Sequence, residues 1–309
     1  MFDRARDAGV RAAGFEWLSE QVIRYGDVLP REILENGYVY NGDRVPFIGP
    51  QGIFKPRILQ VPISITTVPK GPYNDFYGGD GFIRYRYRGT DQDHRDNQGL
   101  RLAMELEIPL AYFFCVAPGR YFATWPVFVV RDEPEKLTFS VAVDDAIHIG
   151  IRPDAKGYDP RIEDPFESGR RAYVTSTVRV RLHQRAFRER VLEAYRRQCA
   201  FCRLRHEELL DAAHIIPDSA PEGEPAVTNG LALCNLHHSA FDRFFIGVRP
   251  DYIIEIRPDI LREGDGPTLR HAIQGLHGQR IVLPAHVAHR PDPALLAQRY
   301  DQYRENAIT

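Results

Sequence analysis

The first half of the chain shows two different spacings of apolar residues. Over 2–25, apolar residues recur three or four positions apart, which predicts an amphipathic opening helix. From about residue 38 to 143, short runs of β-branched and aromatic residues alternate with turns rich in Gly, Pro and Asp. The expected strands are 58–67, 82–87, 110–116, 121–130 and 137–143, with one helix near 97–106. This pattern predicts a curved sheet or small barrel with few helices.

The second half begins after a stretch, 152–169, whose Pro, Asp and Gly content predicts a linker. Helical spacing returns at 184–195, and short strands then alternate with turns up to a final helix at 293–306. A length of 309 residues also favours two domains. We therefore predict an α+β protein with domains 1–165 and 166–309.

Composition changes this picture little. Hydrophobic residues make up 43% of the chain, enough for real cores, and charged residues 27%, which is ordinary. A formal net charge of -2 weighs only weakly against nucleic-acid binding, because binding needs only a local basic face. No segment resembles a signal peptide or is long enough to span a bilayer. We expect a cytoplasmic protein without a membrane partner.

A local basic face is available on the helix expected at 184–195 and just before it. Arginines are dense between residues 170 and 197. A solvated amphipathic helix is the plain interpretation of such a run. The position directly before a metal motif favours phosphate contacts instead. The expected DNA-backbone residues are Arg179, Arg181, Arg185 and Arg188.

Cysteine and histidine spacing predicts a zinc site. Cys199 and Cys202 form a CxxC pair, and a CxxH pair, Cys234 and His237, follows. Zinc takes such ligands in a tetrahedron, and two short hairpins supply two each. With all four positions filled by protein, the ion holds the fold and does no chemistry. A redox CxxC would need a thioredoxin-like βαβ context, which is absent.

Between and after the predicted zinc ligands, the segments AAHI, NGLALC, HH and FD follow one another in this order. Each contains one or more further polar residues. From residue 184 to the C-terminus, this order resembles the HNH nuclease family, also called ββα-metal. The resemblance implies a metal-dependent DNA endonuclease that hydrolyses phosphodiester bonds by a one-metal mechanism. The residues it singles out are Asp211, His214, Asn229, His238 and Asp242.

The chemistry of hydrolysis assigns these residues roles. His214 is expected to deprotonate water, which requires a neutral imidazole. Asn229 would orient His214 or its hairpin. His238 and Asp242, four residues apart, share one helix face and could hold Mg²⁺ or Mn²⁺. A core histidine and a helix cap or salt bridge are the plain alternatives for His214 and Asp242.

One position departs from the family pattern. Many members place a metal-binding His or Asp directly before the base histidine, where this chain has Ala213. Side chains alternate along a strand, so Asp211 points the same way as Ala213. Asp211 is therefore the candidate for the missing carboxylate of the catalytic cation site.

Weaker motifs in the first half resemble an SRA domain, a PUA-like fold that flips modified cytosine out of DNA. They include Pro62-Ile-Ser-Ile-Thr66, Tyr73-Asn-Asp75 and Tyr85-Arg-Tyr87-Arg-Gly89, followed by an Asn-led helix. The resemblance implies that Tyr73 and Tyr87 stack on the flipped base while Asp75 accepts from its exocyclic amine. Tyrosines also fill ordinary strand cores. Arg88 stands where SRA domains usually have a small hydroxylated residue.

Together the halves predict a modification-dependent, type IV-like restriction endonuclease of the kind that serves phage defence. It would recognise 5-methylcytosine or 5-hydroxymethylcytosine in double-stranded DNA by base flipping, with structural Zn²⁺ and catalytic Mg²⁺ or Mn²⁺. A homodimer is expected, because one HNH site cuts one strand. The alternatives are an HNH endonuclease that ignores base modification, and a non-catalytic zinc-stabilised DNA reader.

Overall fold

The computed structural model describes residues 2–68, 82–144, 165–218, 220 and 223–307. These residues form two compact units, Met1–Leu182 and His183–Thr309, called unit 1 and unit 2 below. The sequence placed the domain boundary at 165/166, within the linker expected at 152–169. Most of that linker lies outside the described residues. Its last part, from Pro165, is the start of a helix, so the linker prediction is wrong there.

Unit 1 contains most of the strands expected from the sequence. The elements in chain order are α1 (Arg4–Tyr25), β1 (Val28–Pro30), α2 (Arg31–Asn36), β2 (Tyr38–Tyr40), β3 (Asp43–Val45), β4 (Ile53–Phe54), β5 (Ser64–Thr67), β6 (Ile83–Arg86), α3 (Arg95–Glu105), β7 (Leu110–Ala117), β8 (Arg120–Glu133), a 3-10 turn η2 (Pro134–Lys136) and β9 (Thr138–Val143). The strand expected at 58–67 is shorter than predicted. Pro62 cannot donate to a ladder, and β5 begins only after it.

The main sheet of unit 1 is mixed and strongly curved. Its described strands follow the order β4-β5-β7-β8-β9-β6, and β1 pairs with β8. β5 and β7 run parallel, and the other neighbours are antiparallel. Although β5 and β6 are separated by three strands, the Tyr85 hydroxyl donates to the Thr66 carbonyl over 3.4 Å. The sheet therefore curls into a half-barrel, which agrees with the curved sheet predicted from the sequence.

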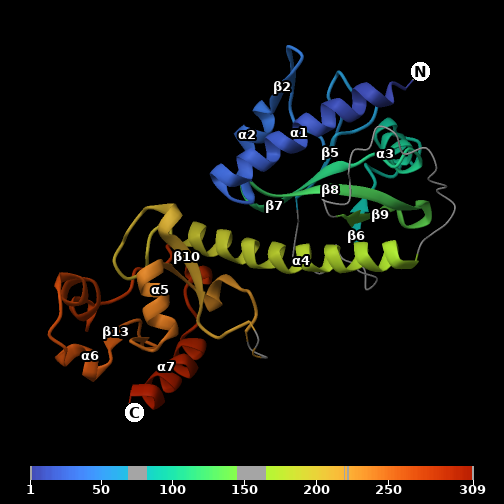
Figure 1. The fold of residues 1–309 in the computed structure, drawn as a ribbon. Coiled ribbons are helices and arrows are strands. Elements are labelled where there is room, and N and C mark those ends of the chain that lie inside the picture. The colour runs from blue at the N-terminus through green and yellow to red at the C-terminus, as the bar shows by residue number, and fades with distance from the viewer. Residues whose placement is uncertain (1, 69–81, 145–164, 219, 221–222, 308–309) are drawn as a thin grey trace. The chain divides into compact units, whose positions relative to one another are not determined.

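Helix α1 lies along one face of this sheet (Figure 1). It buries Val10, Gly14 and Leu18, which are spaced four residues apart on one stripe. Arg11 is buried beside them, pairs with Asp7, and donates to the carbonyls of residues 61, 62 and 109. These bonds satisfy a buried cation and fix the helix to the loops that precede β5 and β7.

Unit 2 is built around a ββα arrangement. After α4 (Pro165–Ala194), which begins in unit 1, its elements are η3 (Glu207–Leu209), β10 (Leu210–His214), η4 (Val227–Asn229), β11 (Gly230–Cys234), α5 (Asn235–Asp242), β12 (Ile246–Val248), β13 (Ile254–Ile256), α6 (Pro258–Arg262), a π-helix (Thr268–Ile273), η6 (Gln274–Leu276), η7 (Val287–His289) and α7 (Pro293–Ala307). The basic helix expected at 184–195 is thus longer than predicted, and the final helix lies where expected.

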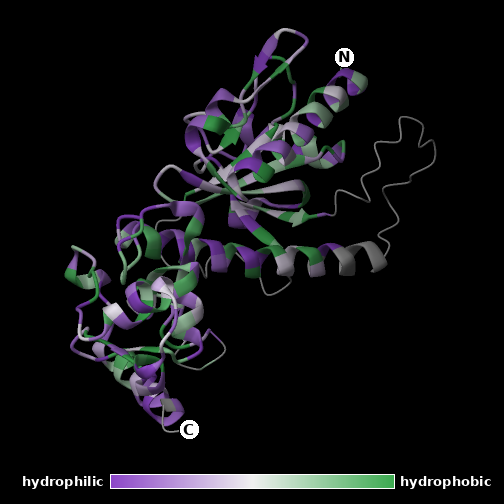
Figure 2. Ribbon diagram, turned by 60° about the vertical axis from the view of Figure 1, so that its left-hand side comes forward, coloured by the Kyte–Doolittle hydropathy of each residue, from purple (hydrophilic) through white to green (hydrophobic). Residues whose placement is uncertain are grey.

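Hydrophobic and hydrophilic residues alternate along α4 (Figure 2). Its C-terminal part buries Phe187, Val191 and Leu192 in the core of unit 2. A Cβ at Gly230 would lie only 2.4 Å from Val191, so glycine is what allows α4 to pack directly on the start of β11. The helix thereby supports the strand pair that carries the site. Among the described residues, none of the helices could cross a membrane.

Candidate active site and metal centre

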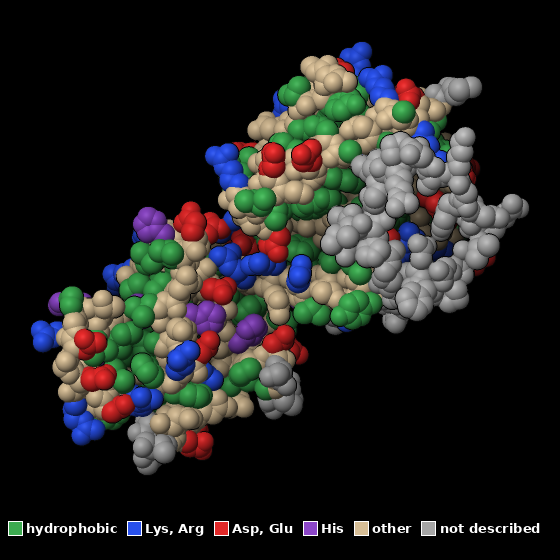
Figure 3. Space-filling model, viewed as in Figure 1, with side chains coloured by type: hydrophobic (Ala, Val, Ile, Leu, Met, Phe, Trp, Pro, Cys, Tyr) green, Lys and Arg blue, Asp and Glu red, His purple; other side chains and the backbone are tan. Residues whose placement is uncertain are grey.

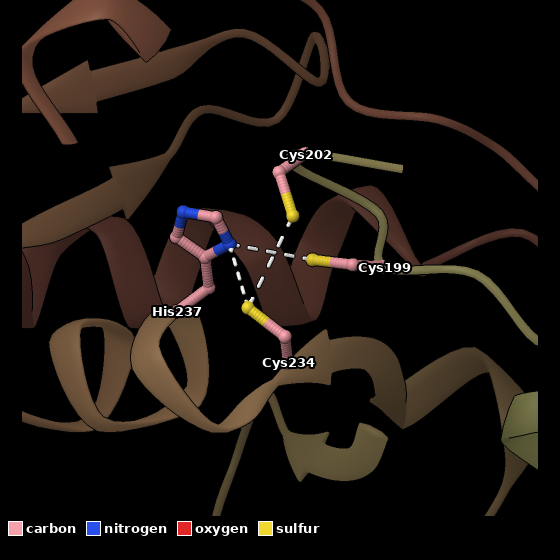
Figure 4. Close-up of side chains that lie close together, drawn as sticks. All are labelled: Cys199, Cys202, Cys234 and His237. Carbon is pink, nitrogen blue, oxygen red and sulfur yellow. Dashed lines mark hydrogen bonds between the residues drawn. The ribbon is translucent and has the colours of Figure 1, made fainter. Parts of the chain in front are cut away.

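The four predicted zinc ligands meet in unit 2, with their ligand atoms within 4.8 Å of one another (Figure 4). His237 Nδ1 lies 3.4 Å from Cys199 Sγ and 3.2 Å from Cys234 Sγ, and Cys202 Sγ lies 4.0 Å from Cys234 Sγ. CxxC comes from the loop before β10, and CxxH from the junction of β11 and α5. The structure thus brings together the four residues that their spacing grouped.

The donor set fits a tetrahedral zinc ion. Three sulfurs and one imidazole nitrogen are the set that structural zinc prefers. The second nitrogen of His237, Nε2, lies 2.7 Å from the Ala272 carbonyl, the kind of outer partner that fixes a ligating histidine. Burial lowers the pKa of His237, but hydrogen bonds to Cys199 and Cys234 outweigh it and raise the pKa to about 10. The sulfur atoms around His237 thus favour a positive charge at this centre.

Strands β10 and β11 pair antiparallel from Leu210↔Cys234 to His214↔Gly230, and α5 follows directly. The Cys₃His cluster lies at the end of this pair that joins α5, and His214 ends β10 at the other end. Histidines lie among acidic and basic side chains on the surface of unit 2 (Figure 3). Burial, followed by a smaller electrostatic effect of His238, lowers the pKa of His214, so the two imidazoles are electrostatic neighbours.

The His214 ring is held by stacking rather than by a hydrogen bond to Asn229. It lies parallel to Phe187 of α4, with ring centroids 3.9 Å apart and an interplanar angle of 13°. Its Nε2 is buried and has no hydrogen-bond partner in the described part of the chain. Burial lowers the pKa of His214, the largest of several effects, although Asp218, Asp211 and Asp242 raise it. A half-buried, neutral imidazole is the form that a general base requires.

We predict a cleavage rate that stays high at mildly acidic pH. A base with a pKa below 6.5 loses its proton-accepting form only when the pH falls through that lowered value. The acid limb of single-turnover rate against pH should therefore have its midpoint below 6.5. A midpoint above 7 would contradict the lowered pKa. The catalytic metal is kept saturating at each pH, so that metal loss does not imitate the limb.

His238 lies between two carboxylates on α5 and β10. Its Nδ1 is 3.7 Å from Asp211, and its Nε2 is 3.3 Å from Asp242. The two carboxylates thus face opposite edges of the His238 ring. An ion held by His238 and one carboxylate would be bound by the second carboxylate as well only if a side chain rotates. Both carboxylates are about half exposed, which leaves room for that rotation. Oxygen ligands with one imidazole suit Mg²⁺ or Mn²⁺.

The structure shows why the position before His214 carries no metal ligand. Ala213 is fully buried in the core of unit 2, whereas Asp211 remains 48% exposed. Arg188 of α4 holds this part of β10: it donates to the Leu210 carbonyl over 2.8 Å, and its Nε lies 3.4 Å from Asp211. It also pairs with the buried Glu189. Arg188, predicted to contact DNA, therefore has partners within the protein that fix Asp211.

Asn229 pins the segment that follows His214. Its side-chain oxygen accepts from the Ile216 backbone N–H, and its amide donates to the Ile216 and Glu224 carbonyls, all within 2.9–3.1 Å. The side chain is 1% exposed. Of the two roles expected from the sequence, this geometry agrees with orientation of the hairpin.

The other arginines predicted to contact DNA lie on the same helix. Arg179, Arg181 and Arg185 are exposed on α4. Arg181, Arg185 and Arg188 are spaced four and three residues apart, which places them along one side of a helix. This arrangement leaves Arg181 and Arg185 accessible to a phosphate backbone.

Arg299 of α7 is a residue that sequence reasoning did not single out. Its side chain is 8% exposed, and its guanidinium carbon lies 4.9 Å from the Phe241 ring centre and 4.2 Å from that of Phe244. It donates to the carbonyls of Phe241 and Asp242 at the C-terminal end of α5. A cation at this end complements the helix dipole and holds the turn that carries Asp242. Arginines are common near a C-terminus, so the sequence offered no signal.

We predict that Arg299→Met weakens the site without removing zinc. Unpairing two carbonyls and losing the cation should cost about 1–3 kcal/mol of stability. The Mn²⁺ concentration needed for half-maximal cleavage should rise more than the KM for DNA, because Asp242 is the group set free. The matched control is Arg304→Met, an exposed arginine on the same helix. Equal effects of the two substitutions would contradict the role given to Arg299.

Of the three residues predicted to form a modified-base pocket, the structure describes Tyr87. Tyr73 and Asp75 lie outside the described residues. Tyr87 is 6% exposed, and its ring stacks on Phe139 with centroids 4.5 Å apart. Its hydroxyl bonds to Asp132 and accepts from Arg101 over 3.1 Å. One face of the Tyr87 ring is thus already covered within unit 1.

Comparison with known proteins supports the assignment of unit 2. Residues 199–249 match a family model described as HNH endonuclease, which confirms the predicted metal-dependent endonuclease. No curated protein sequence matches the chain.

Solved structures that resemble the chain include two restriction enzymes. The modification-dependent TagI restriction endonuclease is 16% identical, with 79% of this chain and 82% of that one covered, at a TM-score of 0.28. The type IV phosphorothioation-dependent restriction endonuclease ScoMcrA is 15% identical, with 81% of this chain and 50% of that one covered, at a TM-score of 0.21. At these TM-scores the whole chains do not superpose, so neither carries an argument about substrate.

Proposed function

Because residues 199–249 form an HNH endonuclease domain, we propose that this chain is a restriction endonuclease that cleaves double-stranded DNA carrying modified cytosine. One observation carries the nuclease part: His238 lies between the carboxylates of Asp211 and Asp242, on the same ββα arrangement whose first strand ends at His214. In this proposal unit 1 binds and reads DNA, and unit 2 hydrolyses it.

The residues of unit 2 divide the hydrolysis between them. Phe187 holds the neutral imidazole of His214, which accepts a proton from water. The resulting hydroxide attacks phosphorus, the P–O bond to the leaving group breaks, and the released oxyanion takes a proton from solvent. A divalent cation held by His238 with Asp211 or Asp242 would supply stabilisation of the charge on the phosphate. Asn229 and Arg188 keep the strand and loop around His214 in place.

The modified-base part rests on the resemblance to SRA domains and on the curled sheet of unit 1. A flipped cytosine would stack on Tyr73 and Tyr87 and bond to Asp75. The 5-methyl and 5-hydroxymethyl forms are the candidates. One HNH centre cuts one strand, so double-strand cleavage would use two chains, and we propose a homodimer on DNA.

A second candidate is favoured by the state of Tyr87. Its ring is stacked on Phe139 and its hydroxyl is bonded, so a base cannot use it without a rearrangement. An HNH endonuclease that ignores cytosine modification would need no such change. The two candidates share the whole of unit 2 and differ only in what unit 1 recognises.

Digestion of matched duplexes separates the two candidates. We expect the chain, with Mn²⁺ or Mg²⁺, to cut DNA containing 5-methylcytosine or 5-hydroxymethylcytosine at least about tenfold faster than unmodified DNA, since a pocket contact differing by 1.4 kcal/mol gives that ratio. Equal rates on all substrates would select the modification-independent enzyme. Binding without cleavage in every metal tested would point to a non-catalytic reader.

A further inference from the structure

A basic hollow in unit 1 takes no part in the proposed hydrolysis of the phosphodiester bond. It is bounded by β6, the end of β8, η2 and the start of β9, and has a volume of about 450 Å³. Its charged lining residues are Arg84, Arg86, Glu133 and Lys136. All of them lie on regular structure or a short turn, so the strand pair itself sets their positions.

Strand register fixes the side of the sheet on which the hollow lies. In the β6–β9 pair, Arg84 is opposite Ser140 and Arg86 is opposite Thr138. Side chains alternate along a strand, so both arginines project from the face opposite to Tyr85. Tyr85 points into the half-barrel, where it meets Thr66. The hollow is therefore a separate feature on the other face of these strands.

The charges of the hollow do not cancel. Glu133 is shared by Arg84 and Lys136, at 2.7 Å and 2.8 Å. The side chain of Arg86 is exposed and has no ion pair or hydrogen bond among the described residues. Three cations and one carboxylate leave an excess of two positive charges. Glu133 holds two cations in place, and the excess charge favours an anionic ligand.

The lining suits a phosphate rather than a base. It offers cations and the hydroxyl of Thr138, but Tyr87, its aromatic residue, is buried and stacked on Phe139. Base recognition needs an open aromatic face or an edge reader, and phosphate recognition needs only donors and positive charge. The volume exceeds that of a single phosphate, so part of the adjoining sugar fits as well.

From this we infer that the hollow binds a backbone phosphate of duplex DNA, with Arg86 and Lys136 as its main donors. The inference rests on the proposed function and adds a contact that fixes where unit 1 sits on the duplex. Phosphate contacts position a protein without reading sequence. The contact therefore contributes equally to binding of modified and unmodified DNA.

The test measures DNA binding by the full-length His214→Ala chain with fluorescein-labelled duplexes, by fluorescence anisotropy at several salt concentrations. Arg86→Glu and Lys136→Glu should each raise the Kd about tenfold and reduce the slope of log K against log salt by about one. The loss should be the same for duplexes with cytosine and with 5-methylcytosine. Arg4→Glu, on the exposed first turn of α1 and outside the lining of the hollow, is the charge-matched control and should change little.

The outcomes separate this inference from the proposed function. If the parent binds DNA tightly and both Arg86→Glu and Lys136→Glu keep its affinity and salt slope, the phosphate site is overturned but the proposed function is not. Failure of the parent to bind any duplex would overturn the proposed function and this contact with it. Free deoxycytidine monophosphate is also tested as a competitor, at concentrations near the Kd of the duplex. Competition that is lost in Arg86→Glu would show a free-nucleotide site and contradict a DNA contact. Thermal melting confirms that each variant is folded.

Discussion

Substitution His214→Ala should lower the single-turnover cleavage rate by about 10²–10⁴-fold, the usual contribution of a general base. His214 has the features this role requires: Phe187 fixes its ring, and burial, the largest effect on its pKa, lowers that pKa below 6.5. The loss should appear in kcat, because the imidazole acts on water and not on the binding of DNA. Affinity for the duplex and zinc content should stay at the parent level.

His286→Ala is the matched control for this substitution, since His286 is an exposed histidine of unit 2. It should cleave at the parent rate. Residual activity of His214→Ala that rises with pH as hydroxide becomes available would agree with loss of a base. Full activity of His214→Ala with Mg²⁺ or Mn²⁺ would remove the catalytic assignment.

The second large effect concerns the Cys₃His centre. Cys234→Ser should abolish zinc binding and unfold unit 2, because structural zinc contributes folding free energy of on the order of 10 kcal/mol, comparable with the whole stability of a domain. Cys234 ends β11 directly before α5, so loss of the centre frees the helix that carries His238 and Asp242. The measurements are zinc per chain by atomic emission and thermal melting by circular dichroism.

Cys115→Ser serves as the control for loss of a thiol. Cys115 is a cysteine of unit 1, in β7, and takes no part in the Cys₃His centre. This variant should keep one zinc per chain and parent-like cleavage. A Cys234→Ser chain that still melts cooperatively at the parent temperature in a strong chelator would contradict a zinc-dependent fold.

Local sequence predicted the features that depend on spacing. CxxC and CxxH identified the four residues of the Cys₃His cluster because each pair is set by one short turn. Runs of β-branched and aromatic residues bounded by turns located the long strands β7 and β8, most of whose residues are buried. His214 and Asn229 were singled out by the resemblance of their segments to HNH nucleases, and the structure places them at the borders of the paired strands β10 and β11.

Contacts between distant segments could not be predicted in this way. The stacking of Phe187 on His214 and the contact of Arg299 with the end of α5 join residues far apart in sequence, and each looks like an ordinary helix residue. Arg188 was predicted to face DNA, but its bonds to β10 depend on how α4 packs against that strand. The placement of His238 between two carboxylates likewise depends on the angle between α5 and β10.

The central claim is that His214 and His238 serve one phosphate in different roles, one as base and the other as metal ligand. Titration of the zinc-loaded chain with Mn²⁺, followed by electron paramagnetic resonance, tests this division most directly. We expect one bound Mn²⁺ in the parent and in His214→Ala, and at least about tenfold weaker binding in His238→Ala, a change of 1.4 kcal/mol. Parent-like Mn²⁺ affinity in His238→Ala, or its loss in His214→Ala alone, would contradict the account.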